Sequence, residues 1–163
     1  MRRPRWTLFA SLLLAALALV PAGAHLLELP NKIDLNASEY LTVQQVYRGW
    51  AFAGAFVFGA LAGTALLAFQ LRWQRRLLIP VLIALGCLVA TQVVFWTLNF
   101  PANQQTQNWV TLPANWEELR QRWEWGHAAS AAFNLCALIA LLVATMRLST
   151  GDSWLRRRPD ALA

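Results

Sequence analysis

Four long apolar segments, separated by clusters of arginine, constrain the fold of this chain more than any other feature. They cover approximately residues 6–27, 50–71, 77–98 and 127–146. Each is long enough to cross a hydrocarbon core, which needs roughly 20 consecutive apolar residues. A segment in lipid must satisfy its own backbone polar groups. The sequence therefore predicts an all-α, integral membrane four-helix bundle that forms a single membrane domain over residues 1–163.

The basic residues predict how these helices are oriented. Ten of the fourteen Lys and Arg residues lie in three clusters beside the apolar segments. Cytoplasmic loops collect Lys and Arg, so both termini and the connection between the second and third segments are predicted to be cytoplasmic. The clusters are Arg2/Arg3/Arg5, Arg72/Arg75/Arg76 and Arg147/Arg156/Arg157/Arg158. Positive charge divided in this way indicates contact with membrane lipid and not with nucleic acid. A composition rich in Ala, Leu and Arg favours a bacterial inner membrane.

The first apolar segment has two interpretations. Its basic start, its apolar run and the small residues at 22–24 are typical of a secretory signal peptide that is cleaved after Ala24. Against cleavage, apolar residues continue as far as Leu29, and a three-helix remainder would lose one wall of the bundle. We favour retention of residues 1–24. The orientation of the later helices is the same under both interpretations.

Cap-like sequences predict that helices extend beyond the outer face of the membrane. Asn36 is followed three residues later by Glu39, the spacing of a capping box, and the helix that they start is expected to continue into the second apolar segment. Asn115 and Glu118 have the same spacing ahead of the fourth segment. Pro30 is expected to end the first helix. The sequence thus predicts extracytoplasmic helix extensions and loops.

A stripe of small residues runs along the second apolar segment. Ala51, Ala55, Gly59 and Gly63 recur every four residues, which allows a neighbouring helix to approach closely. Packing within the chain is the favoured interpretation. A homodimer that uses Gly59 and Gly63 is the alternative.

Polar side chains from three helices are expected at a common depth in the outer half of the bundle. A charged side chain at the bilayer centre costs about 2.5–3.5 kcal/mol or more, so such groups usually face a cavity or one another. The sequence therefore predicts a polar pocket open to the outside. Its candidate residues are His25, Glu28, Gln92, Trp96, Asn99, Asn103, Arg120, Trp123, His127 and Asn134.

His25, Glu28 and His127 are the candidate catalytic residues. Together they have the composition of a metal site with two histidines and one carboxylate, and two histidines from different helices can also bracket a haem. Glu28 is alternatively a general base, with either histidine relaying the proton. A further alternative is that Glu28 forms an ion pair with Arg48 or Arg120. The sequence does not identify a cofactor or a metal.

Two motifs resemble those of the anthrone oxygenase-like family of small four-helix membrane proteins. Residues 99–103 read Asn-Phe-Pro-Ala-Asn, and residues 119–123 read Leu-Arg-Gln-Arg-Trp ahead of His127. The similarity covers approximately residues 93–140, and this chain has Gly126 where the family pattern has Trp before the histidine.

The resemblance implies a four-helix fold and an oxidoreductase or oxygenase-like activity on a small molecule, although most bacterial members of the family have unknown function. Polyketide anthrones are the substrates that it names. The candidate substrate-binding residues are Gln92, Trp96, Asn99, Asn103, Arg120 and Trp123. The alternative is a non-catalytic membrane protein that binds a lipid, a quinone or a partner subunit.

Overall fold

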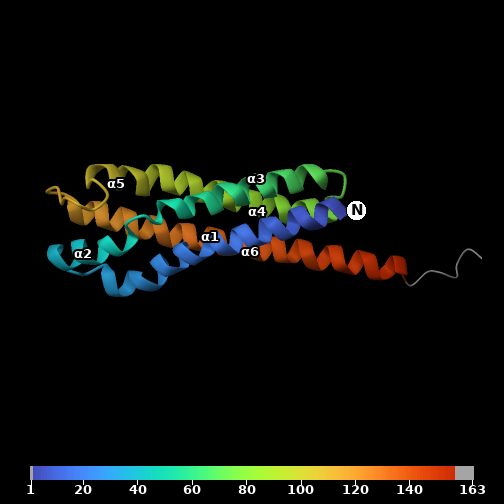
Figure 1. Cartoon of the computed structure of the whole chain (residues 1–163), viewed down its shortest axis with the longest axis horizontal. Helices are drawn as coiled ribbons and strands as arrows, with labels where there is room; N and C mark the ends of the chain where they lie inside the picture. The colour runs from blue at the N-terminus through green and yellow to red at the C-terminus, as the bar shows by residue number, and fades with distance from the viewer. Residues whose placement is uncertain (1, 157–163) are drawn as a thin grey trace, which may run out of the picture.

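Four long helices lie side by side in the computed structural model, which describes residues 2–156 (Figure 1). Two short helices lie at the end of the bundle away from the N-terminus. No strand occurs in the described part of the chain, which confirms the all-α prediction. The long helices are α1 (Arg2–Lys32), α3 (Gly54–Gln70), α4 (Arg75–Val94) and α6 (Trp116–Arg156); the short ones are α2 (Ala37–Gln44) and α5 (Phe100–Gln105).

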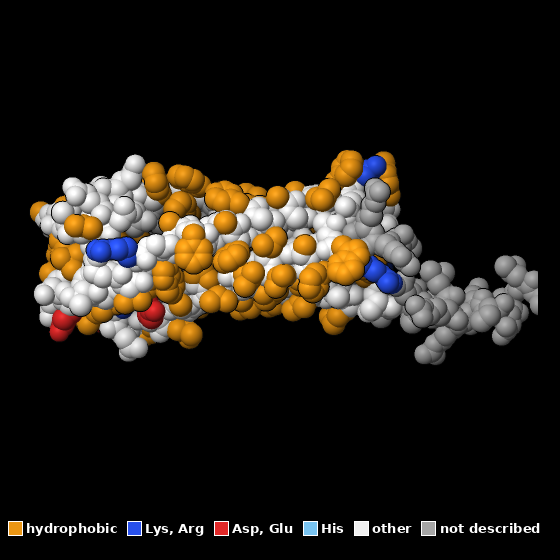
Figure 2. All heavy atoms as spheres, in the orientation of Figure 1, with side chains coloured by type: hydrophobic (Ala, Val, Ile, Leu, Met, Phe, Trp, Pro, Cys, Tyr) orange, Lys and Arg blue, Asp and Glu red, His pale blue; other side chains and the backbone are white. Residues whose placement is uncertain are grey.

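The long helices have the length and hydropathy of membrane spans. Figure 2 shows hydrophobic side chains along the middle of the visible face, with charged side chains towards its two ends. The protein is accordingly a multi-pass membrane protein. The candidate spans are Pro4–Lys32, Trp50–Gln70, Arg75–Gln105 and Trp116–Ser149. The first, third and fourth spans extend past the predicted apolar segments at the end of the bundle where α2 and α5 lie (Figure 1).

Small residues bring α1 and α3 into close contact. A Cβ atom placed on Gly63 would lie 2.8 Å from Ser11 Oγ, and one placed on Gly59 would lie 3.2 Å from a methyl carbon of Leu14. Lipid provides little hydrophobic drive for helix association, so close packing of this kind stabilises the bundle. The glycine stripe thus packs within the protomer, and the homodimer stays a prediction.

The first helix continues past Pro30, contrary to the sequence prediction. Both Pro21 and Pro30 lie inside α1, which ends at Lys32. Proline removes only its own amide donor, and the ladder resumes with the bond from Ile33 N to Leu29 O at 3.0 Å. Lys32 is therefore one turn above Glu28, on the same helix face.

The segment between α2 and α3 is broken, whereas the sequence predicted one continuous helix. The capping box is confirmed: Glu39 N donates to Asn36 Oδ1 at 3.0 Å, and Asn36 N donates to Glu39 Oε2 at 3.4 Å. Beyond α2, the chain forms a 3-10 turn (Gln45–Tyr47) and turns at Gly49, whose φ of 88° is left-handed. Glycine adopts this conformation without a steric penalty, and a second 3-10 turn, Trp50–Ala53, leads into α3.

A π-helical turn, η3 (Phe95–Asn99), joins α4 to α5. Phe100 N bonds to Phe95 O, five residues back. Pro101 follows, and it has no amide hydrogen for the carbonyl four residues earlier, which explains why the ladder widens here. The wide turn leaves Asn99 fully buried in the bundle. Single π turns inside α-helices are frequent at functional sites.

The orientation of the helices is open to a direct test. Gln74 lies between α3 and α4 and Gln105 lies at the end of α5, and both side chains are exposed. We expect a membrane-impermeant maleimide, added outside intact cells, to label Gln105→Cys but not Gln74→Cys, with Cys87 and Cys136 replaced by serine. Labelling of Gln74→Cys alone would reverse the predicted topology.

Candidate functional site

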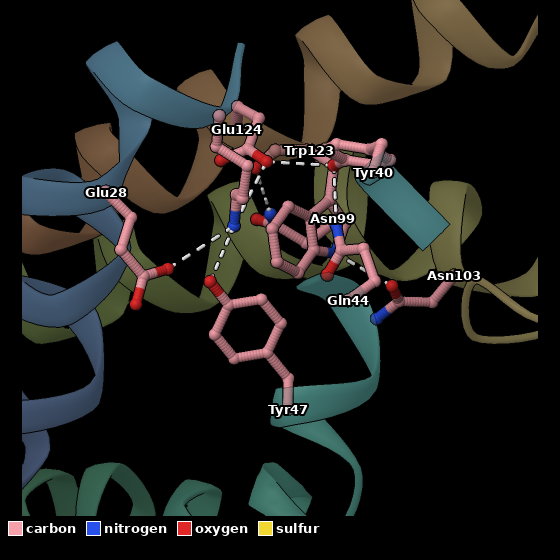
Figure 3. A network of polar contacts seen from close by, with 9 residues as sticks. Glu28, Tyr40, Gln44, Tyr47, Asn99, Asn103, Trp123 and Glu124 are labelled. Atoms are coloured by element: carbon pink, nitrogen blue, oxygen red, sulfur yellow. Dashed lines mark hydrogen bonds and ion pairs between the residues drawn. The ribbon is translucent and has the colours of Figure 1, made fainter. Parts of the chain in front are cut away.

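A buried lysine, Lys32, lies at the end of the bundle where α2 and α5 lie (Figure 1), between two carboxylates and a phenol whose residues are labelled in Figure 3. Lys32 Nζ is 3.2 Å from Glu124 Oε1 and 3.5 Å from Glu28 Oε2, and it donates to Tyr47 Oη at 2.7 Å. The side chains of Lys32 and Glu124 are 3% and 0% exposed, whereas that of Glu28 is 39% exposed. The ammonium group therefore joins α1 to α6 and to the turn after α2, with Glu28 at the rim.

Glu124 receives a second hydrogen bond from α2. Tyr40 Oη donates to Glu124 Oε1 at 2.8 Å, and Gln44 Nε2 donates to Tyr40 Oη at 2.5 Å. Burial and the neighbouring Glu124 carboxylate both raise the pKa of Tyr40 above its ordinary value. The phenol therefore stays protonated at neutral pH and acts as the donor.

Two imidazole rings stack beside the lysine. The ring centroids of His25 and His127 are 4.2 Å apart with an interplanar angle of 29°. The Trp123 ring meets both of them edge-on, at 5.0 and 4.2 Å. Tyr47 lies 4.4 Å from His25, and Lys32 Nζ lies over the rings of Tyr47 and Trp123, at 4.3 and 4.9 Å. His25 and the ammonium group thus share two aromatic neighbours, Tyr47 and Trp123, and His127 contacts the second of them.

Several polar atoms of this cluster have no hydrogen-bond partner in the described part of the chain. They include His25 Nδ1, Glu28 Oε2, Gln44 Oε1, Asn99 Oδ1 and Glu124 Oε2. Buried polar groups in proteins nearly always have a partner. These atoms are therefore available to bind a further group.

The position of Trp123 is fixed from the π turn and from α5. Asn99 Nδ2 donates to the Trp123 carbonyl at 2.8 Å, and Trp123 Nε1 donates to Asn103 Oδ1 at 2.8 Å. Gly126, one turn along α6, lies directly against the Asn99 amide. The Asn-x-Pro-x-Asn motif thus positions the indole that contacts both histidines.

The structure brings together only part of the predicted set. His25, Glu28, Trp123 and His127 meet around Lys32, and Asn99 and Asn103 hold the indole. Their side chains pack directly against one another where the sequence predicted that they line a pocket. The six residues of this group are His25, Glu28, Asn99, Asn103, Trp123 and His127.

The other predicted residues lie elsewhere. Arg120 donates to the Leu35 carbonyl at 2.6 Å, which joins α6 to the loop between α1 and α2. Trp96 is 51% exposed and its ring contacts Phe95 and Phe100. Gln92 is half-buried on α4, about two helical turns before Asn99. Asn134 donates to Ser130 O of its own helix.

Two expectations about the catalytic residues need correction. Glu28 pairs with Lys32 and not with Arg48 or Arg120, because α1 continues past Pro30. The imidazoles do not bracket a haem, since rings 4.2 Å apart leave no room for a porphyrin between them. Among the described residues, no three His, Cys, Asp or Glu side chains are placed to hold a metal ion.

Sequence reasoning missed the residues at the centre of the cluster. Lys32 is the only lysine in the chain. It follows Glu28 by four residues, so the two side chains would have been predicted on one face if the first helix had been continued past Pro30. Glu124 precedes His127 by three residues on α6, so both were predictable on one face. The polar side chains contributed by the segment around α2 are Tyr40, Gln44 and Tyr47.

Comparisons of the chain with protein-family models, curated proteins and solved structures found no match. The assignment to the anthrone oxygenase-like family therefore stays a prediction, carried by the motifs at residues 99–103 and 119–127.

Proposed function

We propose that this membrane protein is an oxidoreductase that binds a small molecule against the His25–His127 pair and oxidises it. The observation that carries the proposal is the stack of two imidazoles beside a buried ammonium group, Lys32. An imidazole with a free nitrogen is a suitable proton acceptor, and a fixed cation nearby stabilises negative charge as it develops on a substrate oxygen.

Each residue of the cluster has a separate role in the proposed reaction. His25 Nδ1 takes a proton from a substrate C–H or O–H bond that a carbonyl group has made acidic. Lys32 stabilises the resulting enolate or phenolate, and Glu124 keeps the ammonium group in place. The anion then adds dioxygen, the co-reactant that the family resemblance suggests, at the carbon that lost the proton. The peroxide takes back the proton held by His25, and the hydroperoxide loses water to leave a carbonyl group, so that one dioxygen is consumed and one water is released. His127 supports the ring of His25 and completes the proton path.

Anthrone is the probe that tests this proposal, because the resemblance names that class of molecule. We expect the full-length protein in lipid nanodiscs to consume dioxygen with anthrone faster than protein-free nanodiscs do. His127→Ala is expected to lower the excess rate by about 10²-fold or more, the usual effect of losing a positioned acid-base group. Its melting temperature should stay close to that of the parent.

Arg122→Ala is the matched control, because Arg122 lies on the surface of the same helix, away from the histidines. Its side chain is 56% exposed and pairs with Glu118. Its excess rate of oxygen consumption and its melting temperature should both match those of the parent. No excess oxygen consumption in the parent, together with a large fall in the melting temperature of His127→Ala, would contradict the proposed oxidoreductase activity. That result would favour the alternative, a non-catalytic protein whose polar cluster holds the helices together.

A further inference from the structure

We propose that Tyr47 is a catalytic residue of this site, whose phenolic hydrogen is donated to the substrate oxygen on which negative charge develops. This role rests on the proposed function and adds to it the group that touches that oxygen. As the substrate C–H bond breaks, its proton goes to His25 Nδ1 and its electron pair forms the enolate. Tyr47 keeps its hydrogen and stabilises the enolate oxygen by a hydrogen bond, so this step needs no co-reactant.

Lys32 has no hydrogen left for a substrate. An ammonium group has three hydrogens, and three oxygen atoms already lie within 3.5 Å of Nζ. They are Tyr47 Oη at 2.7 Å, Glu124 Oε1 at 3.2 Å and Glu28 Oε2 at 3.5 Å. The side chain of Lys32 is also only 3% exposed. Its charge therefore acts on a substrate through one of these three oxygen atoms.

Tyr47 is the group among the three that can donate to a substrate. An ionised carboxylate only accepts hydrogen bonds, whereas a phenol that accepts one still has its own hydrogen to donate. The Tyr47 hydroxyl group accepts from Lys32 and donates to no atom in the described part of the chain. Because successive hydrogen bonds polarise one another, the bond from Lys32 makes this phenol a stronger donor. Tyr47 is also half-buried, whereas Lys32 is buried.

The proposed base lies beside this donor. The ring centroids of His25 and Tyr47 are 4.4 Å apart with an interplanar angle of 51°. Within residues 2–156, His25 Nδ1 also has no hydrogen-bond partner. Removal of a proton next to a carbonyl group is fastest with a base at the C–H bond and a donor at the oxygen. The two neighbouring rings supply one group of each kind.

The turn around Gly49 fixes the position of the phenol. Tyr47 ends the first 3-10 turn, Gly49 follows with its left-handed φ of 88°, and Trp50 begins the second turn. This path brings the Trp50 ring back to 5.2 Å from Tyr47 and to 5.9 Å from His25. The ring of Tyr47 is thus held by Trp50, His25 and Lys32. A donor that is already in place needs no reorganisation when charge develops.

Hydrogen exchange into anthrone under argon tests this step separately, because exchange needs proton abstraction but no dioxygen. The full-length protein in lipid nanodiscs is mixed with anthrone in deuterated buffer, and deuterium at the methylene carbon is measured by mass spectrometry after acid quenching. We expect the parent to exchange faster than protein-free nanodiscs. Tyr47→Phe, which retains the ring, should lower this excess rate by about 10²–10³-fold, the usual effect of losing one oxyanion donor. Its melting temperature should stay close to that of the parent.

Thr42→Val is the matched control, because it removes an exposed hydroxyl group from α2, next to the turn that carries Tyr47. That hydroxyl group donates to the Ser38 carbonyl at 2.9 Å. The excess exchange rate of Thr42→Val should match that of the parent.

The outcomes separate the role of Tyr47 from the proposed oxidation. An unchanged excess rate in folded Tyr47→Phe would overturn the role of Tyr47 and leave the oxidation in place. A parent that exchanges deuterium but consumes no excess dioxygen would contradict the oxidation, and a slow Tyr47→Phe would still support the donor. A parent without excess exchange would overturn the role of Tyr47.

Fluorine NMR of the parent provides a second test if Tyr47→Phe is not folded. The chain has only two tyrosines, so 3-fluorotyrosine gives two resonances. A water-soluble paramagnetic agent should broaden that of half-buried Tyr47 before that of fully buried Tyr40. Anthraquinone has carbonyl oxygens but no methylene hydrogen to lose, and we expect it to shift the Tyr47 resonance alone. A shift of the Tyr40 resonance alone, or of neither, would overturn the role of Tyr47.

Discussion

Replacing Lys32 with methionine is expected to lower the free energy of unfolding by about 3–5 kcal/mol, the usual cost of removing one partner of a buried ion pair. The substitution keeps most of the apolar stem and removes the ammonium group. Glu124 is then left buried without its cation, with only the Tyr40 hydroxyl as a hydrogen-bond partner. Equilibrium unfolding in mixed micelles measures the change.

The surface pair of Arg122 and Glu118 is the control for this prediction. Its atoms are 2.6 Å apart, closer than those of the buried pair, but both side chains are more than half exposed. Arg122→Ala should therefore cost less than about 1 kcal/mol. A second test combines Lys32→Met with Glu124→Leu, which should recover much of the lost stability because no buried charge remains unpaired. If Lys32→Met and Arg122→Ala lower the free energy of unfolding by equal, small amounts, the buried ion pair does not stabilise the protein as predicted.

The features that the sequence predicted well depend on local sequence. Hydropathy over a window of about 20 residues identifies a span without knowledge of its neighbours, and all four predicted spans are helices. The capping box of Asn36 and Glu39 is likewise complete within four residues. For the same reason, the extension of the fourth helix back to Trp116, ahead of its apolar segment, was predictable.

The centre of the site depends on contacts that local patterns do not contain. The ion pair of Lys32 with Glu124 joins the first and last long helices. It also required α1 to continue past Pro30, which a rule that treats proline as a helix terminator excludes. Proline deprives only the carbonyl four residues before it of a donor, and the amides after it still bond, as Ile33 N does to Leu29 O.

The misplacement of Trp96 has a specific cause. Helical spacing grouped Trp96 with Gln92 and Asn99 on one face, on the assumption of 3.6 residues per turn. The π turn over Phe95–Asn99 adds an extra residue to the turn, so the faces before and after it no longer align. Asn99 is consequently buried, whereas Trp96 is exposed.

Replacing Gly126 with alanine is expected to destabilise the protein by about 1–3 kcal/mol, as overpacking of a well-packed interior usually does. A Cβ atom at this position would lie 2.7 Å from Asn99 Oδ1 and 2.9 Å from its Nδ2. Asn99 has little freedom to move, because it is fully buried and its Nδ2 is bonded to the Trp123 carbonyl. The same contact explains why a residue without a side chain stands at position 126.

Gly86→Ala is the control for the predicted destabilisation by Gly126→Ala. A Cβ atom on Gly86 meets nothing within 4 Å, so this change should be neutral or should stabilise α4 by up to about 1 kcal/mol through helix propensity. The loss at Gly126 is then the measured difference between two Gly→Ala changes in helices. If the Asn99 amide is the cause, Gly126→Ala should cost less in an Asn99→Ala background, with a coupling of about 0.5–3 kcal/mol. Equal costs of Gly126→Ala in both backgrounds would show that the amide does not limit the approach of α6 to the π turn.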